Sequence, residues 1–236
     1  MKYLKILTIA VFGLLLFGAC KKDTPIDKNV TASDLAGHYV AVEAKMGNYV
    51  VVRLVNFYAE GGVIKADWYK VNDKRSATVT ISENTFSFDL FDTGADVYVF
   101  NFSKNASGGV MLNSLKSEGP NNIDILHAEM YNSKDIPNWG GKTFELLTEP
   151  YGNIYSKYIK FSENKTKVAF ARGLSNMPEE TCIVISNNAG FKTGRDANAI
   201  NTLGIFVPSW KGDSNVKLLE TLTSNNYGYA TCKLYN

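Results

Sequence analysis

The chain repeats itself at a fixed spacing, and this repeat limits the possible folds more than any other feature of the sequence. A gap-free shift of 104 residues gives about fifteen identities in about a hundred pairs, where composition predicts about six or seven. An ancient tandem duplication explains such a repeat, so two related modules are expected. The aligned identities run from Gly37 and Gly141 through Phe57 and Phe161 to Asp92 and Asp196, and end with Tyr131-Asn132 and Tyr235-Asn236.

Both halves consist of short stretches rich in β-branched and aromatic residues. Tyr49–Tyr58 and Tyr155–Phe161 are such stretches, and Ala77–Ser82 alternates Val79 and Ile81 with polar residues. Glycine and asparagine turn signals separate the stretches about every ten residues. The sequence therefore predicts an all-β protein with antiparallel meanders duplicated in tandem, as two small β-barrels or sandwiches. The alternative is one larger barrel of about ten to twelve strands.

The N-terminal residues have the features of a secretory signal. A lysine-containing start precedes the apolar run Ile6–Phe17, which at about a dozen residues is too short to span a bilayer comfortably. We expect residues 1–19 to be removed as a signal peptide. Residues 20–32 begin with a polar stretch without hydrophobic periodicity and are expected to form a tether. The two β-modules are then expected at residues 33–134 and 135–236.

The string Gly18-Ala19-Cys20-Lys21-Lys22-Asp23 resembles the lipoprotein signal of Bacteroidetes-type bacteria. The resemblance implies that Cys20 becomes the lipid-modified first residue of the mature protein. It also implies a lipid anchor in the outer membrane, with the folded part facing the cell surface or the periplasm. Outer-membrane lipid is then one partner, and a neighbouring membrane transporter is a candidate for another.

The charge balance excludes one class of partner. The chain has 25 Lys and Arg against 23 Asp and Glu, and removal of Lys2 and Lys5 with the signal leaves 23 against 23. A near-neutral body lacks the basic surplus with which proteins bind nucleic acid. No nucleic-acid partner is therefore expected.

The start of each module suggests a more specific fold. Asp34-Leu35-Ala36-Gly37-His38-Tyr39 is similar to the opening Leu-x-Gly-x-aromatic motif of lipocalin-like barrels, and Gly140-Gly141-Lys142-Thr143-Phe144 is a weaker second version. In that family the first strand begins after a glycine turn, and its aromatic residue closes the barrel floor. The resemblance implies lipocalin-like (calycin-like) modules, or a single lipocalin-like barrel in the alternative fold.

The sequence gives little support for catalysis. Phe91-Asp92-Thr93-Gly94-Ala95-Asp96 resembles the active-site loop of retroviral-type aspartic proteases, which requires two facing aspartates. The equivalent Asp196 lacks the following Thr-Gly, and Asp-Thr-Gly is also a β-turn sequence, so we interpret the string as a turn. Neither His38 nor His127 has a second ligand at metal spacing. The sequence thus predicts no enzyme, no metal and no cofactor.

Cys182 and Cys232 could form a disulfide in an oxidising compartment. Strand alternation argues against this pairing. Cys232 shares a face with Ala230 on the expected core side, whereas Cys182 alternates with Ile183, whose counterpart Val79 is expected to be buried. The two cysteines are therefore predicted to face opposite sides.

Four aromatic residues are the candidate ligand-binding residues: Trp68, Tyr69, Trp139 and Trp210. Exposed tryptophans beside Asn and Asp stack on sugar rings, and such residues equally cover the edge of a core, so both interpretations stay open. The sequence predicts a non-enzymatic, membrane-anchored extracytoplasmic binding protein that captures glycans or other nutrients. The alternatives are a lipocalin-like carrier of a small apolar ligand and an adhesion or structural envelope protein.

Overall fold

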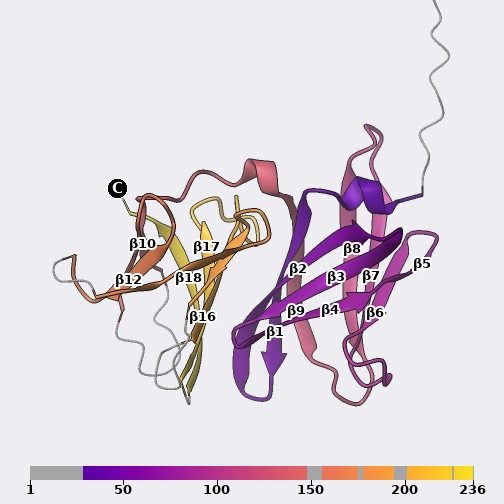
Figure 1. Cartoon of the computed structure of the whole chain (residues 1–236), viewed down its shortest axis with the longest axis horizontal. Coiled ribbons are helices and arrows are strands. Elements are labelled where there is room, and N and C mark those ends of the chain that lie inside the picture. The colour runs from indigo at the N-terminus through magenta and orange to yellow at the C-terminus, as the bar shows by residue number, and fades with distance from the viewer. Residues whose placement is uncertain (1–28, 148–155, 175–177, 194–200, 225, 236) are drawn as a thin grey trace, which may run out of the picture.

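The computed structural model describes residues 29–147, 156–174, 178–193, 201–224 and 226–235, in which strands predominate. Every strand pairing is antiparallel, which confirms the predicted all-β fold (Figure 1). The helical elements within these residues are the short 3-10 helices η1 (Ala32–Leu35) and η2 (Ser133–Asp135). The strands are β1 (His38–Met46), β2 (Tyr49–Glu60), β3 (Val63–Lys70), β4 (Asp73–Thr78), β5 (Thr80–Ser82), β6 (Thr85–Asp89), β7 (Val97–Lys104), β8 (Val110–Glu118), β9 (Asp124–Asn132), β10 (Thr143–Leu146), β11 (Tyr158–Phe161), β12 (Lys167–Ala171), β13 (Glu179–Thr181), β14 (Ile183–Ile185), β15 (Gly190–Lys192), β16 (Asn201–Phe206), β17 (Leu218–Ser224) and β18 (Asn226–Leu234).

The strands form two successive meanders, which we call the N-terminal barrel (β1–β9) and the C-terminal barrel (β10–β18). In the first, the sheet β4-β3-β2-β1-β9 faces the sheet β5-β6-β7-β8, and only Val79 separates β4 from β5. In the second, one nine-stranded sheet runs from β13 through β10 and β18 to β14. Its two edge strands follow each other in the chain and are separated only by Cys182, so this sheet is nearly closed.

The two meanders have the same strand order at the spacing of the sequence repeat. β12 begins 104 residues after β3, and β16 begins 104 residues after β7. Among the described residues no strand of one barrel pairs with a strand of the other, so the alternative of one larger barrel is wrong. The predicted module boundary at residues 134 and 135 falls in η2, which connects the barrels.

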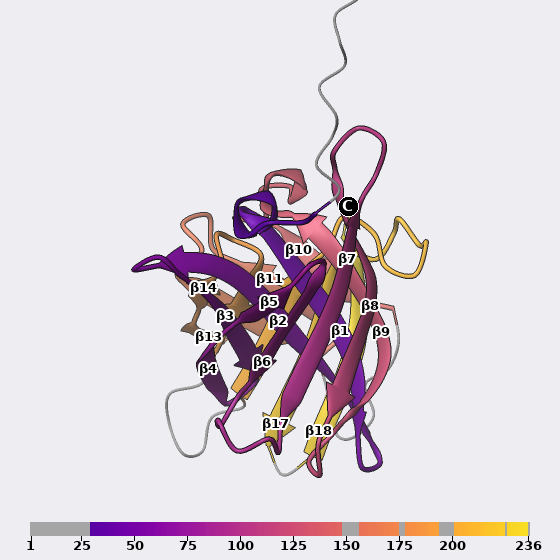
Figure 2. The same cartoon turned by 90° about the vertical axis from the view of Figure 1, so that its right-hand side faces the viewer.

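Three hydrophobic cores hold the molecule together. One fills the N-terminal barrel, one fills part of the C-terminal barrel, and the third lies between the two barrels, where the outer faces of β1 and β2 pack on β16 and β17. Figure 2 looks onto the N-terminal barrel, with the C-terminal strands behind it. Close packing requires glycine at position 190, where a Cβ would lie 2.5 Å from the carbonyl oxygen of Gly204 and 3.3 Å from Leu54 Cδ1 of the other barrel.

Strand alternation fails where a β-strand has two buried faces or is interrupted. Ile183 is 39% exposed, although its alignment with Val79 predicted a buried position. Cys182 lies in the interior of the C-terminal barrel together with Cys232, not on the opposite side, because the strand is interrupted at Cys182. Both thiols are buried and free, so the phase argument was wrong although it led to the unbonded state that is observed.

Candidate functional site

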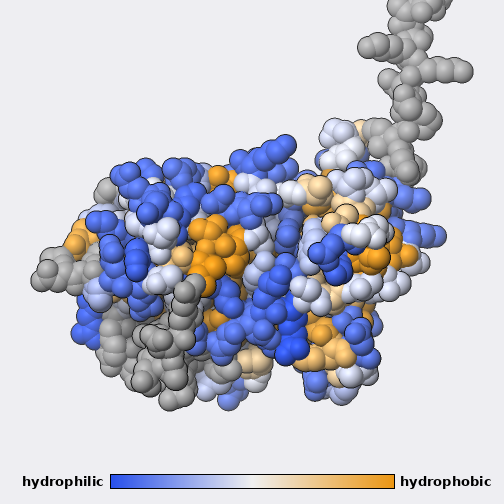
Figure 3. All heavy atoms as spheres, in the orientation of Figure 1, coloured by the Kyte–Doolittle hydropathy of each residue, from blue (hydrophilic) through white to orange (hydrophobic). Residues whose placement is uncertain are grey.

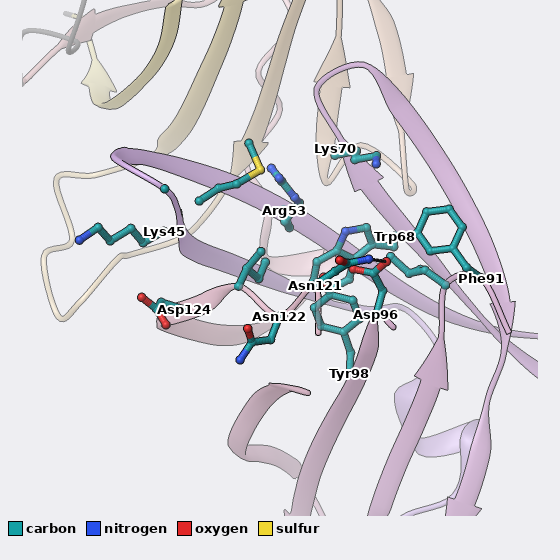
Figure 4. A pocket seen from close by; sticks show the side chains of 14 residues that line it. Lys45, Arg53, Trp68, Lys70, Phe91, Asp96, Tyr98, Asn121, Asn122 and Asp124 are labelled. Carbon is teal, nitrogen blue, oxygen red and sulfur yellow. Dashed lines mark hydrogen bonds between the residues drawn. The ribbon is translucent and has the colours of Figure 1, made fainter. Parts of the chain in front are cut away.

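A pocket of about 500 Å³ lies at the end of the N-terminal barrel that is distant from η1 (Figure 4). The turns β1–β2 and β8–β9 and the loop from β6 to β7 surround it, and the ends of β2, β3 and β7 form its floor. Its volume is within the range of small-molecule sites in proteins, which are concave and few per chain. The meander itself creates this open end of the barrel, which we call the mouth, because alternate turns lie at the same end.

The floor combines a buried cation with two stacked aromatic rings. Arg53 of β2 is 6% exposed, and its Nη1 donates a hydrogen bond to the carbonyl of Val52 at 2.8 Å. The rings of Trp68 and Tyr98 stack with centroids 4.0 Å apart. Burial raises the pKa of Tyr98, so its hydroxyl stays protonated. A guanidinium in an aromatic floor can hold a carboxylate, sulfate or sugar hydroxyl.

Backbone contacts between two turns fix one wall of the pocket. The N–H of Asn121 donates to the carbonyl of Ala95 at 3.0 Å. Gly119 has φ of +94°, and a Cβ there would lie 2.6 Å from the carbonyl oxygen of Gly94. A side chain at position 119 would therefore force these turns apart.

Hydrogen bonds within the β6–β7 loop also restrict its conformation. The Asp89 carboxylate accepts hydrogen bonds from the N–H groups of Gly94 and Phe91, which lower the pKa of Asp89. The Asp-Thr-Gly string is part of this loop, and its Asp92 is exposed with φ of +56°. This placement agrees with a turn, while Asp196 lies outside the described residues. The pocket wall is thus built largely by backbone geometry.

Half-buried and exposed side chains give the rim a mixed character. Lys70 stands above the floor, Asp96 and Asn122 line the wall, and the ring of Phe91 is 42% exposed (Figure 4). One face of that ring is covered by the guanidinium of Arg75, 4.2 Å from the ring centroid. Amides, carboxylates, cations and an aromatic face together can bind a small polar ring-shaped ligand, because they supply directed hydrogen bonds and stacking.

Of the four aromatic residues predicted to bind a ligand, the structure places one in this pocket. Trp68 lines the floor at 1% exposure, whereas its neighbour Tyr69 points to the opposite face of β3, into the core between the barrels. The Tyr69 hydroxyl donates to Asp67 Oδ2 at 3.3 Å. The ligand-binding role of these residues stays a prediction, and only Trp68 lies where a ligand could approach.

Trp210 lies between the two barrels rather than on a surface. Its loop extends from the C-terminal barrel to β1 and β9, where the indole is 2% exposed and Nε1 donates to Glu43 Oε2 at 3.3 Å. Lys211 Nζ pairs with the same carboxylate at 2.7 Å, and the His127 ring meets the Trp210 ring edge-on at 4.8 Å. In this arrangement no face of Trp210 is available for a sugar.

Trp139 closes one end of the C-terminal barrel. It is 1% exposed, its Nε1 donates to the carbonyl of Asn188 at 3.1 Å, and its ring stacks on Phe206 at 4.5 Å. Leu35, the residue aligned with Trp139 in the repeat, is fully buried in the core of the N-terminal barrel. Trp139 therefore serves as a barrel plug in this conformation.

The most informative pocket residue, Arg53, was missed at the sequence level. A single charged residue inside the apolar run Val50–Val55 is the signal that could have identified it, because an arginine is rarely buried without a specific role. The described residues contain no group of three or more His, Cys, Asp or Glu side chains that could hold a metal ion. Cys20 lies outside the described residues, and none of the helices within them is long and apolar enough to cross a membrane.

Comparisons with known proteins give no further guide to the site. No protein family, curated protein or solved structure matches the chain.

Proposed function

We propose that the protein is a membrane-anchored extracytoplasmic binding protein that captures a small polar ligand, a glycan fragment in the first instance, in the mouth of the N-terminal barrel. The observation that carries the proposal is Arg53, a buried guanidinium at the floor of a pocket of about 500 Å³. Burial of a charge is costly, so a protein without use for it would place an apolar residue there.

The charges of the pocket favour an acidic ligand over a neutral one. Lys45, Arg53 and Lys70 line it against Asp96 and Asp124, and Arg53 is the most deeply buried of the five. A carboxylate on the ligand would gain a charge-assisted hydrogen bond in a partly desolvated site. Sugar acids combine such a carboxylate with hydroxyls for the rim amides, and are the first candidates.

The two alternative functions have less support. An apolar carrier needs a hollow barrel, but rings fill the N-terminal barrel, where Phe57 packs edge-on against Phe100 at 5.2 Å and Phe102 at 5.9 Å. An adhesion surface needs a large exposed apolar patch. Figure 3 shows separate hydrophobic patches divided by hydrophilic surface on the face in view, and none dominates it.

The test compares galacturonate with galactose, which differ in one carboxylate. We would titrate each into the full chain carrying Cys20→Ser and measure heat of binding. Galacturonate is expected to bind at least about tenfold more tightly than galactose. Arg53→Met should lower the affinity for galacturonate at least about tenfold, because a charged hydrogen bond contributes about 1.5–3 kcal/mol. Equal affinity of the folded Arg53→Met variant would contradict the proposal, and so would absence of binding by both sugars.

Two further variants control for indirect effects. Asn122→Ala removes an exposed rim amide and is expected to weaken binding without lowering the melting temperature. Lys233→Met, on the surface of the other barrel, should leave the affinity unchanged. The anchor is tested separately: the wild-type chain should sediment with outer membranes, and Cys20→Ser should be released into the soluble fraction.

A further inference from the structure

The interior of the C-terminal barrel contains polar groups without partners. Glu220 of β17 is 1% exposed and Thr202 of β16 is fully buried. Glu220 Oε1 and Thr202 Oγ1 have no hydrogen-bond partner. Such buried unsatisfied atoms are rare in proteins, and each costs about 1–3 kcal/mol, so they require an explanation.

Strand register places both groups on the interior face and close together. Leu218 and Phe206 belong to the barrel core, and alternation along β17 and β16 puts Glu220 and Thr202 on the same side as these residues. Glu220 pairs with Gly204, two residues from Thr202, so the carboxyl and the hydroxyl are diagonal neighbours on adjacent strands.

The same positions in the N-terminal barrel are filled by bulky apolar groups. Phe100 pairs with Phe86 and Leu115, and Gly204 pairs in the same way with Phe191 and Glu220. Glu220 thus replaces Leu115, Gly204 replaces Phe100, and Thr202 replaces Tyr98. The Phe191 ring lies against Gly204 and takes part of the space. What remains is an interior with polar hydrogen-bonding groups where the other barrel has rings.

The titratable groups around Glu220 include no cation on the interior face of the described strands. Cys232 faces it from β18, and burial, followed by the nearby Glu220 carboxylate, raises the pKa of the Cys232 thiol. Glu180, which pairs with the core residue Val168, faces the interior from the opposite wall. Arg172, one residue beyond β12, is exposed to solvent. Among the described strands, the interior face is therefore acidic and carries no counter-ion.

We propose that the interior of the C-terminal barrel is a second binding site, which takes a small primary ammonium ion between the Glu220 carboxylate and the Thr202 hydroxyl. An ammonium group has three N–H donors, and these two oxygens are acceptors without donors. Burial raises the pKa of Glu220 to about 8, so the free site is mostly protonated at pH 7. Binding of the cation ionises Glu220, and its proton passes to the buffer.

The test uses propylammonium, with 1-propanol as its neutral counterpart of equal length. Amide resonances of Thr202, Glu220 and Ala230 should shift saturably on addition of propylammonium, and at least about tenfold more 1-propanol should be needed for the same effect. Calorimetry in two buffers of different ionisation enthalpy should show release of nearly one proton at pH 7. As the pH is raised toward 8, the affinity for propylammonium should increase about tenfold per pH unit, and above pH 8 it should level off.

Two interior variants separate binding from folding. Glu220→Gln keeps the shape of the side chain and should weaken propylammonium at least about tenfold while abolishing proton release. Thr202→Val removes only the hydroxyl and should weaken binding by a smaller factor. Absence of saturable shifts, equal binding of 1-propanol, or unchanged affinity of Glu220→Gln would each overturn the proposal. Arg53→Met, in the other barrel, should have no effect on propylammonium, so this site and the mouth pocket can fail independently.

Discussion

The two barrels have the same strand order but very different interiors. In the N-terminal barrel the rings of Phe86, Phe88, Phe100 and Phe102 pack on one another with centroids 5.3–6.1 Å apart. In the C-terminal barrel the rings of Trp139, Phe161, Phe191 and Phe206 pack with centroids 4.5–6.0 Å apart, but Glu220 and Thr202 share that interior. The comparison shows that hydrogen-bonded strand order can persist while the interior changes, and the interior decides where a ligand fits. In the N-terminal barrel the mouth is the place left for a ligand, whereas the interior of the C-terminal barrel has buried polar groups.

The strongest test of the filled interior is Phe100→Ala. Phe100 is fully buried between Phe57, Phe88 and Phe102, so its removal leaves a cavity, and we expect a loss of about 3–5 kcal/mol in the free energy of unfolding. Urea denaturation followed by tryptophan fluorescence measures it. A loss below about 1 kcal/mol would mean that this barrel is not packed as described.

The contact between the barrels is the next target. Trp210→Ala removes a buried indole and its hydrogen bond to Glu43, and a loss of about 3 kcal/mol in unfolding free energy is expected. Trp210→Phe keeps a ring in place and should lose clearly less. If both variants unfold like the parent chain, the two barrels do not depend on this contact.

Added volume at Gly204, the position equivalent to Phe100, should destabilise the protein as well. A Cβ at Gly204 would overlap the Phe191 ring, so Gly204→Ala is expected to cost about 1–3 kcal/mol by overpacking. The same denaturation assay measures this loss. Gly212→Ala is not a suitable control, because Gly212 has φ of +79°, where an alanine would itself be strained. An unchanged midpoint for Gly204→Ala would show that the ring can move away at no cost.

The last prediction concerns the pH dependence of stability. Burial raises the pKa of Glu220 from 4.5 to about 8, so its contribution to stability is fully present below pH 4.5 and is lost as pH rises to about 8. One ionising group changes the unfolding free energy by at most about 1.4 kcal/mol per pH unit. Glu220→Gln should flatten the stability profile by this slope between pH 5 and 8, as measured by denaturation at each pH. If the unfolding free energy of the variant changed with pH in the same way as that of the parent chain, the raised pKa of Glu220 would be contradicted.

The sequence was sufficient for the strands and their duplication, because period-two alternation and turn residues are local signals. It was not sufficient for the faces of β1 and β2, which are buried on both sides by a second barrel that local patterns do not encode. Trp210 shows the same limit: its neighbours Pro, Ser, Lys and Gly are typical of a surface loop, but the loop packs on the other barrel. Glu220 was not singled out, because only register shows which side of β17 it faces.

The difference between the interiors can be measured at a single carboxyl group. In the chain with ¹³C-labelled glutamate side chains, the Glu220 resonance, assigned by its disappearance in Glu220→Gln, would be followed from pH 3 to 10. The structure predicts a midpoint near 8, because the carboxyl is buried and its Oε1 has no hydrogen-bond partner. A midpoint near the ordinary value of 4.5 would show that the group is solvated or paired, and would contradict the polar, unpartnered interior assigned to the C-terminal barrel.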